Sequence, residues 1–522
     1  MKKKKILWID DEIELFRSHI IFLSEKGYEI STVTNGEDAL AIIKEEEIDL
    51  IFLDEMMPGM GGLEVLGRIK ENNPNIPVVM VTKSEEESLM DEAIGGKIKD
   101  YLTKPVNPSQ ILLVCKKILD AKRISSQFVT KDYLQDFNQI SMQLSSNLDY
   151  EEWTELYLKL TSWEVELDSH PETGLRQSLN ELKRECNKEF SRFIEKNYVK
   201  WVNSNSKDNR PKLTVDIMND YVISSIEEEN KTIFFFVLDC LRLDQWLVLE
   251  KPLLDLFKIN KEYYYSILPT ATAYARNSLF AGLYPSEIEK HYPDLWRGSD
   301  EDEKSMNKYE KEFLQLLLDR KRIKLKSDLK YIKIIDPEVG RNFEQNIMSY
   351  QNSHLTAVVV NFLDMMVHGR SDSDLLKEIA PEESAFRSLT NSWYTHSSLL
   401  STFKTLSKMK NVKIIITTDH GSIRSMRGAK VLGDKETSTN LRFKYGRNLK
   451  VDDKHAIFIK DASTYKLPRR GVTVNYIIAK EDYFFVYPTD YHRYLSYYKD
   501  TFQHGGISLE EMILPVITLE PR

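Results

Sequence analysis

Five short apolar runs within residues 1–122, separated by helical patterns, limit the fold of this chain more than any other feature. The runs are Ile6–Ile9, Tyr28–Thr34, Leu50–Leu53, Pro77–Val81 and Tyr101–Thr103. Segments between and after them, such as Leu63–Glu71 and Pro108–Ala121, repeat apolar residues at helical spacing. Strands that alternate with helices favour parallel pairing. We therefore predict an α/β domain with a doubly wound, five-stranded parallel sheet.

Residues that can carry chemistry stand where these predicted strands end. Asp10 and Asp11 follow the first strand, Asp54 the third, Thr82 the fourth and Lys104 the fifth. The carboxyl ends of parallel strands share one edge of a sheet, so these side chains are expected to meet. A carboxylate can accept a phosphoryl group, other acids can hold Mg²⁺, and a lysine can bind phosphoryl oxygens. The alternative is a generic α/β fold with acids at strand ends by chance.

Residues 1–122 resemble the receiver domain of response regulators over their whole length. The resemblance implies a flavodoxin-like fold with Asp54 as the phosphoacceptor and Mg²⁺ held by Asp10, Asp11 and Asp54. It also implies Thr82 and Tyr101 as the switch pair and Lys104 as the phosphate-binding base. Lys83 departs from the family, which has a small residue after the switch threonine. A long side chain there could restrict the attacking water, so the lifetime of the phosphorylated state is left open.

Residues 123–208 have a helical pattern with almost no glycine or proline. A first helix is expected over Gln127–Leu144, and Pro171 separates two later helices. Apolar residues recur at spacings of three and four on one face of each later helix: Trp153, Leu156, Tyr157 and Leu160, then Leu175, Leu179, Leu182, Cys186, Phe190, Phe193 and Ile194. Burial is the usual use of such stripes, so we predict a three-helix bundle.

Residues 209–522 alternate strands and helices again, which predicts a second, larger α/β domain. Its strongest strands are Thr232–Leu238, Ala357–Phe362, Val412–Thr417 and Met512–Leu519. Asp239, Asp364 and Asp419 each follow such a run and are expected at one sheet edge. His368 lies four residues after Asp364, a spacing that places both on one face of a turn or helix.

His420 and His504 add to this set, and Thr272 begins a predicted helix that ends near Gly282. A helix N-terminus favours a phosphate and an alkoxide. Three histidines and three aspartates suit Zn²⁺, or Mn²⁺, better than Mg²⁺. Each residue alone has a simpler interpretation, such as a cap or a core histidine. Together they predict two metal ions that clamp a phosphoryl group.

These motifs resemble the PglZ branch of the alkaline phosphatase superfamily over about 212–522. The resemblance implies one metal on Asp364, His368 and His504, and a second on Asp239, Asp419 and His420, with Thr272 as the bridging nucleophile. The spacing from Thr272 to Gly282-Leu-Tyr-Pro285 is that of the superfamily's nucleotide phosphodiesterases. Arg276 and Asn277 are interpreted either as contacts to a phosphoryl oxygen or as part of an exposed helix face.

The usual DNA-binding partner of a receiver domain, a helix-turn-helix with a basic second helix, is not found in the sequence. Instead, the domain order of receiver, helical bundle and PglZ-type domain resembles that of response regulators of type IX secretion. This resemblance implies phosphodiesterase action on nucleotide or oligonucleotide substrates. It also implies a sensor histidine kinase, a sigma factor and a secretion motor component as partners. An alternative is an interaction protein that dimerises on phosphorylation and keeps a vestigial hydrolase site. In either case we expect a homodimer on phosphorylation, through a face built from Leu89–Ile94, Ile98–Thr103 and Ile111–Leu119.

Net charge and apolar patterning exclude several other classes. The net charge of -9 argues against a nonspecific grip on nucleic acid. The apolar run after Lys2–Lys5 is too short for a signal peptide, and no run approaches the roughly 18 residues of a membrane span. The three cysteines have no metal or redox spacing. We therefore expect a cytoplasmic protein without membrane insertion.

Overall fold

A computed structural model describes residues 3–83, 98–204, 206–228, 231–296, 307–434, 437–471 and 473–522. The chain divides into two compact units, Met1–Asp132 and Tyr133–Arg522. The division falls within helix α6 (Ala121–Gln143). Among the described helices, none is both long enough and apolar enough to cross a membrane.

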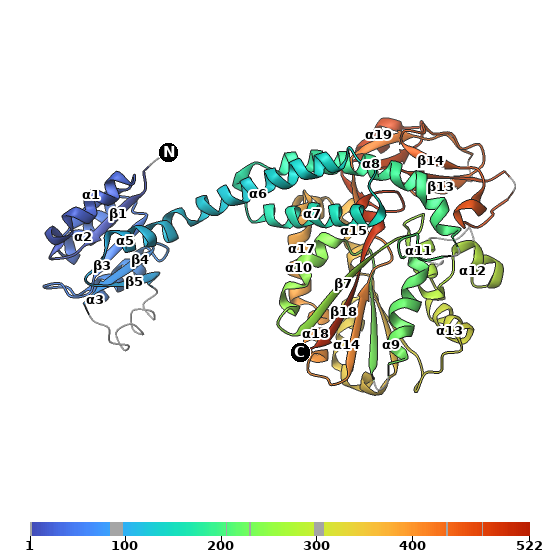
Figure 1. The fold of residues 1–522 in the computed structure, drawn as a ribbon, viewed down its shortest axis with the longest axis horizontal. Coiled ribbons are helices and arrows are strands. Elements are labelled where there is room, and N and C mark those ends of the chain that lie inside the picture. Colours follow the sequence, from blue (N-terminus) through green and yellow to red (C-terminus); the bar gives the residue numbers. More distant parts are fainter. Residues whose placement is uncertain are drawn as a thin grey trace. The chain divides into compact units, whose positions relative to one another are not determined.

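The first unit contains the predicted parallel sheet, drawn in blue in Figure 1. Its strands are β1 (Lys5–Ile9), β2 (Glu29–Val33), β3 (Leu50–Asp54), β4 (Val78–Thr82) and β5 (Asp100–Thr103). They pair in parallel in the order β2-β1-β3-β4-β5. The order reverses direction between β1 and β3, and ligands of open α/β sheets bind at such a switch point. The predicted fold class of this unit is confirmed.

Helices cover both faces of this sheet. They are α1 (Arg17–Glu25), α2 (Gly36–Glu45), α3 (Gly62–Asn72) and α5 (Pro108–Cys115), with short helical turns at Ile13–Phe16 and Lys116–Asp120. Trp8 and Phe52 pack in one core with residues of α1 and α5, while Leu7 and Leu53 pack in the other with residues of α2 and α3. Neighbouring strand residues are therefore buried on opposite faces, which explains why the runs are continuously apolar.

Three helices occupy the region of the predicted bundle: α6, α7 (Tyr150–Asp168) and α8 (Arg176–Val202). Asp149 caps α7 together with Glu152 in a capping box. Tyr133 of α6 packs edge-on against Trp163 of α7, with ring centroids 5.4 Å apart. The predicted helical region is therefore present.

The apolar face of helix α8 also packs against the main sheet of the second unit. Trp201 of α8 lies with its ring 5.4 Å from that of Tyr265, and Phe190 lies 6.2 Å from the same ring. Tyr265 ends strand β7 (Phe257–Tyr265) of the second unit's main sheet. The helical region thus covers part of the larger α/β domain rather than standing as a separate bundle.

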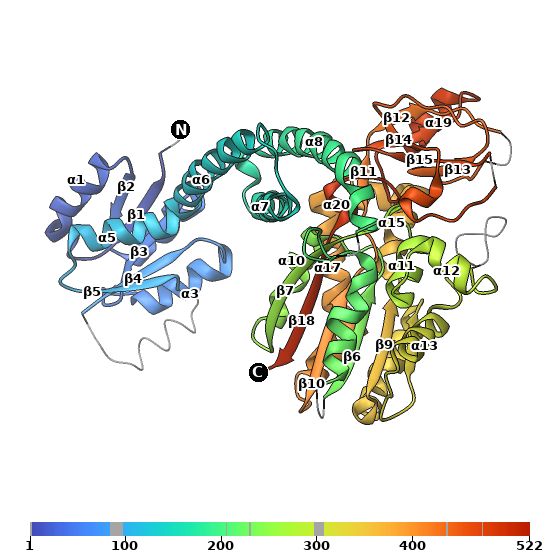
Figure 2. The ribbon, with the colours of Figure 1, turned by 45° about the vertical axis from the view of Figure 1, so that its right-hand side comes forward.

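The main sheet of the second unit has six strands in the order β7-β18-β10-β6-β9-β8. Figure 2 labels the first five of these strands. The further strands are β6 (Thr232–Leu238), β8 (Lys330–Ile334), β9 (Leu355–Val360), β10 (Val412–Thr417) and β18 (Ile513–Pro521). Strands β8, β9, β6 and β10 are parallel, and β18 runs antiparallel to both β10 and β7. The second predicted α/β domain is therefore confirmed.

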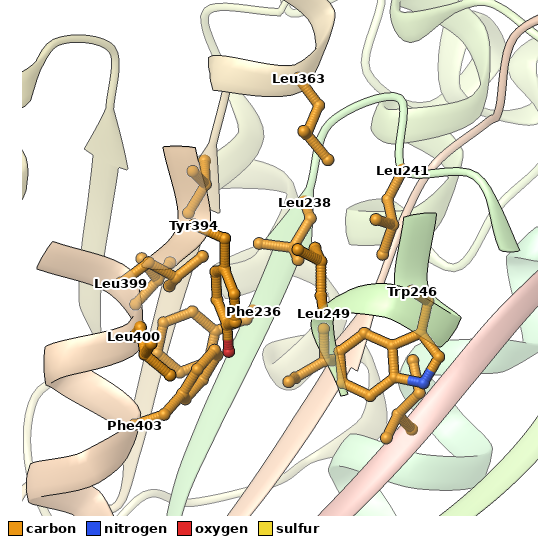
Figure 3. Packing of buried hydrophobic residues seen from close by; sticks show 14 of the residues in the cluster. Phe236, Leu238, Leu241, Trp246, Leu249, Leu363, Tyr394, Leu399, Leu400 and Phe403 are labelled. Carbon is orange, nitrogen blue, oxygen red and sulfur yellow. The ribbon is translucent and has the colours of Figure 1, made fainter. Parts of the chain in front are cut away.

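Helices flank this sheet and connect its strands. They are α9 (Ser224–Ile226), α10 (Leu243–Leu249), α11 (Thr272–Ala281), α12 (Pro285–His291), α13 (Glu310–Lys321), α14 (Pro337–Gln345), α15 (Phe362–Asp372), α16 (Asp374–Ile379), α17 (Glu383–His396), α18 (Ser398–Leu406) and α20 (Leu509–Met512). Phe236 and Leu238 of β6 pack with Trp246 and Phe403 in one core (Figure 3). Phe235, the intervening residue, packs instead against Phe280 of α11, with ring centroids 6.0 Å apart.

A small β-rich region between β10 and β18 was not foreseen from the sequence. It comprises β11 (Ile423–Ser425), β12 (Arg427–Lys430), β13 (Phe443–Gly446), β14 (Ala456–Ile459), β15 (Asn475–Ala479), β16 (Tyr483–Val486), helix α19 (Tyr491–Tyr498) and β17 (Thr501–Gln503). Its strands form three small sheets. Strands this short have no long apolar run, so periodicity does not reveal them. The region matters because His504 directly follows β17.

Candidate metal centre and phosphorylation site

Thr272 is the first residue of helix α11, as the sequence predicted. Ala271 before it has extended backbone, and the helix ends at Gly282, whose φ of 58° lies in the left-handed region that glycine tolerates. The Thr272 Oγ1 atom lies 2.9 Å from Nε2 of His420. The hydroxyl therefore stands at a helix N-terminus and in contact with one predicted metal ligand.

A buried group of ligand types surrounds that contact: Asp239, which follows β6, and Asp419 and His420, which follow β10. His420 Nε2 lies 3.6 Å from Asp419 Oδ2 and 3.9 Å from Asp239 Oδ1. His420 Nδ1 lies 3.0 Å from the carbonyl oxygen of Gly421. Since a carbonyl only accepts, Nδ1 carries a hydrogen, and Nε2 is left to act as a ligand. We call these three residues the buried group.

A second group consists of Asp364 and His368 on α15 and His504 after β17. The Nε2 atom of His368 lies 3.4 Å from Asp364 Oδ1 and 3.4 Å from Nε2 of His504. His504 Nε2 lies 3.7 Å from the same oxygen of Asp364. The side chain of His368 is 52% exposed, so this group faces solvent. We call these three residues the open group.

The two groups adjoin each other. The rings of His420 and His504 stack with centroids 4.2 Å apart. Asp239, Asp364 and Asp419, expected at one sheet edge, are therefore brought together, with the predicted histidines completing each set.

The donor atoms of both groups fit divalent metal ions. Within each group, one oxygen or nitrogen of every residue lies within 4.8 Å of the others. In the part of the chain that the structure describes, no group donates a hydrogen bond to the buried Oδ1 of Asp239. Burial, together with the charges of Asp419 and Asp364, raises the pKa of Asp239 well above its usual value despite the opposing Arg276. A mixed set of carboxylates and imidazoles with this excess of negative charge suits zinc.

Arg276 and Asn277 do not lie on an exposed helix face. Arg276 is fully buried, and its guanidinium pairs with Asp239, with Asp419 at 3.0 Å and with Glu310 at 3.3 Å. Asn277 is also buried and donates to the carbonyl of Ala273 at 2.9 Å. The interpretation of these two residues as part of an exposed helix face is therefore wrong. Arg276 is surrounded by carboxylates and pairs with two aspartates of the buried group, and a contact of Arg276 or Asn277 with a phosphoryl oxygen stays a prediction.

Other residues that position the site were not predicted. Asn361 donates from its side-chain nitrogen to Asp239 Oδ2 at 2.8 Å. Thr270 Oγ1 donates to the carbonyl of Gly506 at 2.8 Å and accepts from the amide of Gly505 at 3.1 Å. These bonds tie the loop before Thr272 to the loop after His504. Asn361 and Thr270 both lie inside the motifs that drew attention to the site, which is the only sequence signal for them.

The strand ends of the first unit also converge. Asp10 and Asp54 are buried and Asp11 is exposed, yet each offers an oxygen within 4.8 Å of the others. Lys104 Nζ lies 2.8 Å from Asp10 Oδ2 and 3.0 Å from Asp54 Oδ2. Burial, with the nearby charge of Asp10, raises the pKa of Asp54, and Lys104 opposes this shift. Three carboxylates with an adjacent ammonium fit Mg²⁺ and a phosphoryl group.

The predicted switch residues lie on the two strands that follow β3 in the sheet order, Thr82 on β4 and Tyr101 on β5. Thr82 ends β4 and donates its hydroxyl to Glu55, while Tyr101 of β5 is 41% exposed. Lys83 places its Nζ 2.7 Å from Glu12 Oε2, and both side chains are largely exposed.

Of the three segments expected to form the dimer face, Leu89–Ile94 lies outside the described residues.

Three family models match the chain. Residues 217–519 match the BREX system PglZ alkaline phosphatase-like domain, 123–202 the PorX response regulator linker domain, and 6–116 the response regulator receiver domain.

Curated relatives match the N-terminal part. The transcriptional regulatory protein ResD of Bacillus subtilis is 36% identical over 124 residues, which are 24% of this chain and 51% of the relative. The alkaline phosphatase synthesis transcriptional regulatory protein PhoP of Bacillus subtilis is 34% identical over 125 residues, 24% and 51% of the two chains. The chain thus spans about half the length of the curated relatives it matches.

Solved structures match the same part. The receiver domain of NtrX from Brucella abortus is 32% identical, with a TM-score of 0.21, and covers 22% of this chain and 98% of its own. A CheY-like receiver domain protein from Methanospirillum hungatei is 29% identical, with a TM-score of 0.22, and covers 23% and 96%.

The PglZ match covers more than half of the chain, and the receiver and linker models match the residues before it. The chain therefore belongs to the PglZ alkaline phosphatase-like domain family, and carries this domain behind a response regulator receiver domain and a PorX-type linker.

Proposed function

We propose that this chain is a two-component response regulator, phosphorylated on Asp54 by a sensor histidine kinase, whose PglZ domain is a zinc-dependent phosphodiesterase. The proposed substrates are nucleotide or oligonucleotide phosphodiesters. By resemblance to PorX, which shares the matched linker type, we propose a role in type IX secretion. A sigma factor and a secretion motor component are the proposed partners in that role.

One relationship carries the enzymatic proposal: Thr272 Oγ1 lies 2.9 Å from His420 Nε2, and the ring of His420 stacks on that of His504. A potential nucleophile thus touches one ligand group, and the second group adjoins the first. Two adjacent metal sites are the arrangement used to clamp both the attacking and the leaving oxygen of an in-line displacement.

The residues of the chain have distinct proposed roles. Asp239, Asp419 and His420 would hold one zinc ion, and Asp364, His368 and His504 the other. Bound zinc would act as a Lewis acid that lowers the pKa of a hydroxyl and neutralises phosphoryl charge. Thr272 presents its hydroxyl from a helix N-terminus, whose backbone amides favour a phosphate group. Arg276 and Asn361 hold the carboxylates of the buried group in place through the contacts given above.

The alternative of a vestigial site is less well supported. The carboxylates of the buried group keep dedicated partners in Arg276 and Asn361, and the two catalytic loops remain tied through Thr270. A site without chemistry has no physical need of buried carboxylates, because burying charge is costly. Partner binding through a phosphorylated dimer is compatible with enzymatic activity.

Hydrolysis by the full-length chain tests the proposal directly. The protein would be loaded with zinc, its metal content measured, and its rate on bis(nitrophenyl) phosphate compared with that on nitrophenyl phosphate. We expect about two zinc ions per chain, a faster reaction with the diester, and loss of the reaction with chelator.

Replacing the proposed nucleophile tests its role. Thr272→Val removes the hydroxyl and keeps the shape, so hydrolysis should fall about 100-fold or more while metal content stays the same. Ser278→Ala is the matched control, because Ser278 lies on the same helix and its hydroxyl has no hydrogen-bond partner within the described residues. Parent-like hydrolysis by the valine variant with both metals bound would exclude Thr272 as the nucleophile.

A further inference from the structure

A cleft of about 200 Å³ opens beside the open group. His368 and His504 form one wall of it. Asn440, Gln503, Tyr497 and Tyr498 are among the residues that line the rest, the tyrosines lying at the end of helix α19. The β-rich region between β10 and β18 therefore supplies most of a recess directly next to a proposed metal site.

The lining has a specific chemical character. Its described residues include two tyrosine rings and two side-chain amides, but no lysine or arginine. Tyr497 remains 49% exposed, although its hydroxyl donates to Asp372 at 3.4 Å and Lys377 Nζ lies 5.8 Å from its ring centroid. Apart from the metal ion proposed for the open group, the described lining offers a phosphate no lysine or arginine, and it places the carboxylate of Asp372 there, so it is unsuited to a second phosphate. Exposed aromatic rings and amides suit an uncharged, flat ring with polar edges.

The spatial arrangement of the site residues indicates which part of a bound substrate lies at the cleft. Thr272 contacts His420, His420 stacks on His504, and His504 contacts His368 at the cleft wall. In an in-line displacement the leaving oxygen lies opposite the attacking one. With Thr272 as nucleophile, the leaving alcohol therefore points toward the open group and the cleft.

We propose that this cleft binds the base of the nucleoside that leaves, by stacking on Tyr497, with the amides of Asn440 and Gln503 facing the base edge. The inference rests on the proposed phosphodiesterase function and names the part of the substrate that determines specificity. A base on the leaving alcohol then speeds hydrolysis, although it does not take part in bond breaking. A base on the retained side does not engage Tyr497.

Matched dinucleotides test this subsite. Thymidylyl-thymidine is compared with two analogues that lack the base on either the 5′ or the 3′ nucleoside and carry a tetrahydrofuran instead, so the leaving alcohol stays nearly the same. In the zinc-loaded parent we expect kcat/KM to fall about 5- to 100-fold when the base is missing from the leaving nucleoside, and little when it is missing from the other. Analysis of the products identifies which nucleoside leaves.

Substitutions on helix α19 test whether the preference for a base on the leaving nucleoside arises in the cleft. Tyr497→Ala should reduce the preference to less than about twofold, and Tyr497→Phe should retain it. Tyr494→Ala is the matched control, because Tyr494 is an exposed tyrosine of α19 that does not line the cleft. An unchanged preference in Tyr497→Ala, or equal slowing of all three substrates, would overturn the proposal.

A binding measurement separates this inference from the proposed function. Calorimetry of zinc-loaded Thr272→Val with the same dinucleotides needs no turnover. Tighter binding of the base-bearing compound that is lost in the Thr272→Val, Tyr497→Ala double variant supports the subsite, even if the parent hydrolyses none of the compounds. In that case the phosphodiesterase proposal alone fails. Equal binding of all compounds by both variants overturns the subsite, whether or not the parent is active.

Discussion

The side-chain oxygen of Asn187, on helix α8, accepts a hydrogen bond of 2.8 Å from the backbone amide of Leu509. Its side-chain nitrogen donates to Glu510 at 3.0 Å. Ser191, one turn later on the same helix, contacts the amide of Glu481 at 3.3 Å. Through Leu509 and Glu510, the linker helix therefore holds the chain segment that follows His504 of the open group.

Replacing Asn187 with alanine should destabilise the second unit by roughly 1–3 kcal/mol, because the buried amide of Leu509 loses its acceptor, while the carboxylate of Glu510 loses one donor and keeps Lys183 at 3.1 Å. Urea unfolding followed by circular dichroism measures the change. Asn197→Ala is a suitable control, since among the described residues the side chain of Asn197 bonds only within its own helix, to the carbonyl of Phe193. Equal stability of the two variants would contradict this role for Asn187.

Replacing Arg276 with methionine should destabilise the metal-free protein by roughly 3–5 kcal/mol, because buried Asp239 and Asp419 lose their shared cation. Zinc should restore part of that loss by supplying positive charge to the same carboxylates. Thermal melting with chelator and with zinc measures both effects, and Arg341→Met, an exposed position on α14, is the control. A zinc-induced increase in Tm no larger than in the parent would refute this compensation.

Lys444 on β13 gives a pH-dependent prediction. Burial lowers the pKa of its ammonium group to about 7, although Nζ donates to the carbonyl of Ser438 at 2.9 Å. Between about pH 7 and 10 the unfolded chain binds a proton here that the folded chain does not, so this residue makes stability rise with pH.

Lys444→Met should abolish that rise and stabilise the protein below pH 7, where the folded state otherwise buries a charge. Comparing urea midpoints of parent and variant at pH 6.5 and 9 measures the effect. Lys408→Met, at an exposed position, should leave the pH dependence unchanged. The same slope in Lys444→Met as in the parent would show that Lys444 stays protonated in the fold.

Asp54 is predicted to be the single phosphorylation site. Its carboxylate is buried next to Asp10 and 3.0 Å from Lys104 Nζ, where an ammonium can bind phosphoryl oxygens. Asp54→Ala should abolish labelling by acetyl phosphate, measured as the mass of the intact protein. Asp100→Ala, which removes a surface partner of Lys117, should label normally. Undiminished labelling of Asp54→Ala would refute the assignment.

Phosphorylation is predicted to cause dimerisation of the receiver domain. Leu113 of α5, within the expected Ile111–Leu119 segment, is 67% exposed, and pairing of two copies would bury it. Light scattering with beryllofluoride and Mg²⁺ should show a doubled mass for the parent and a monomer for Leu113→Glu. Leu15→Glu, at an equally exposed position on another element, is the control. A parent that stays monomeric would contradict the prediction.

Much of the architecture and of the candidate site was predictable because the signals are local. Thr232–Leu238 and Val412–Thr417 are strands with the expected bounds, and the residues that follow them meet at one sheet edge. Parallel strands bring their carboxyl ends together whatever their order, so Asp239 and Asp419 could be assigned to one place. Asp364 and His368 are four residues apart, and on a helix this spacing places both side chains on the same face.

Other features depend on packing between distant segments. Arg276 could not be distinguished from a surface residue by periodicity, and only the approach of Asp239, Asp419 and Glu310 buries it. The apolar faces of α7 and α8 predict the core of a helix bundle. In the structure, contacts such as that of Trp201 with Tyr265 place α8 against the main sheet of the second unit. Helical periodicity says that a face is buried but does not say against what. That choice, and the cleft beside His504, come from segments far apart in the chain.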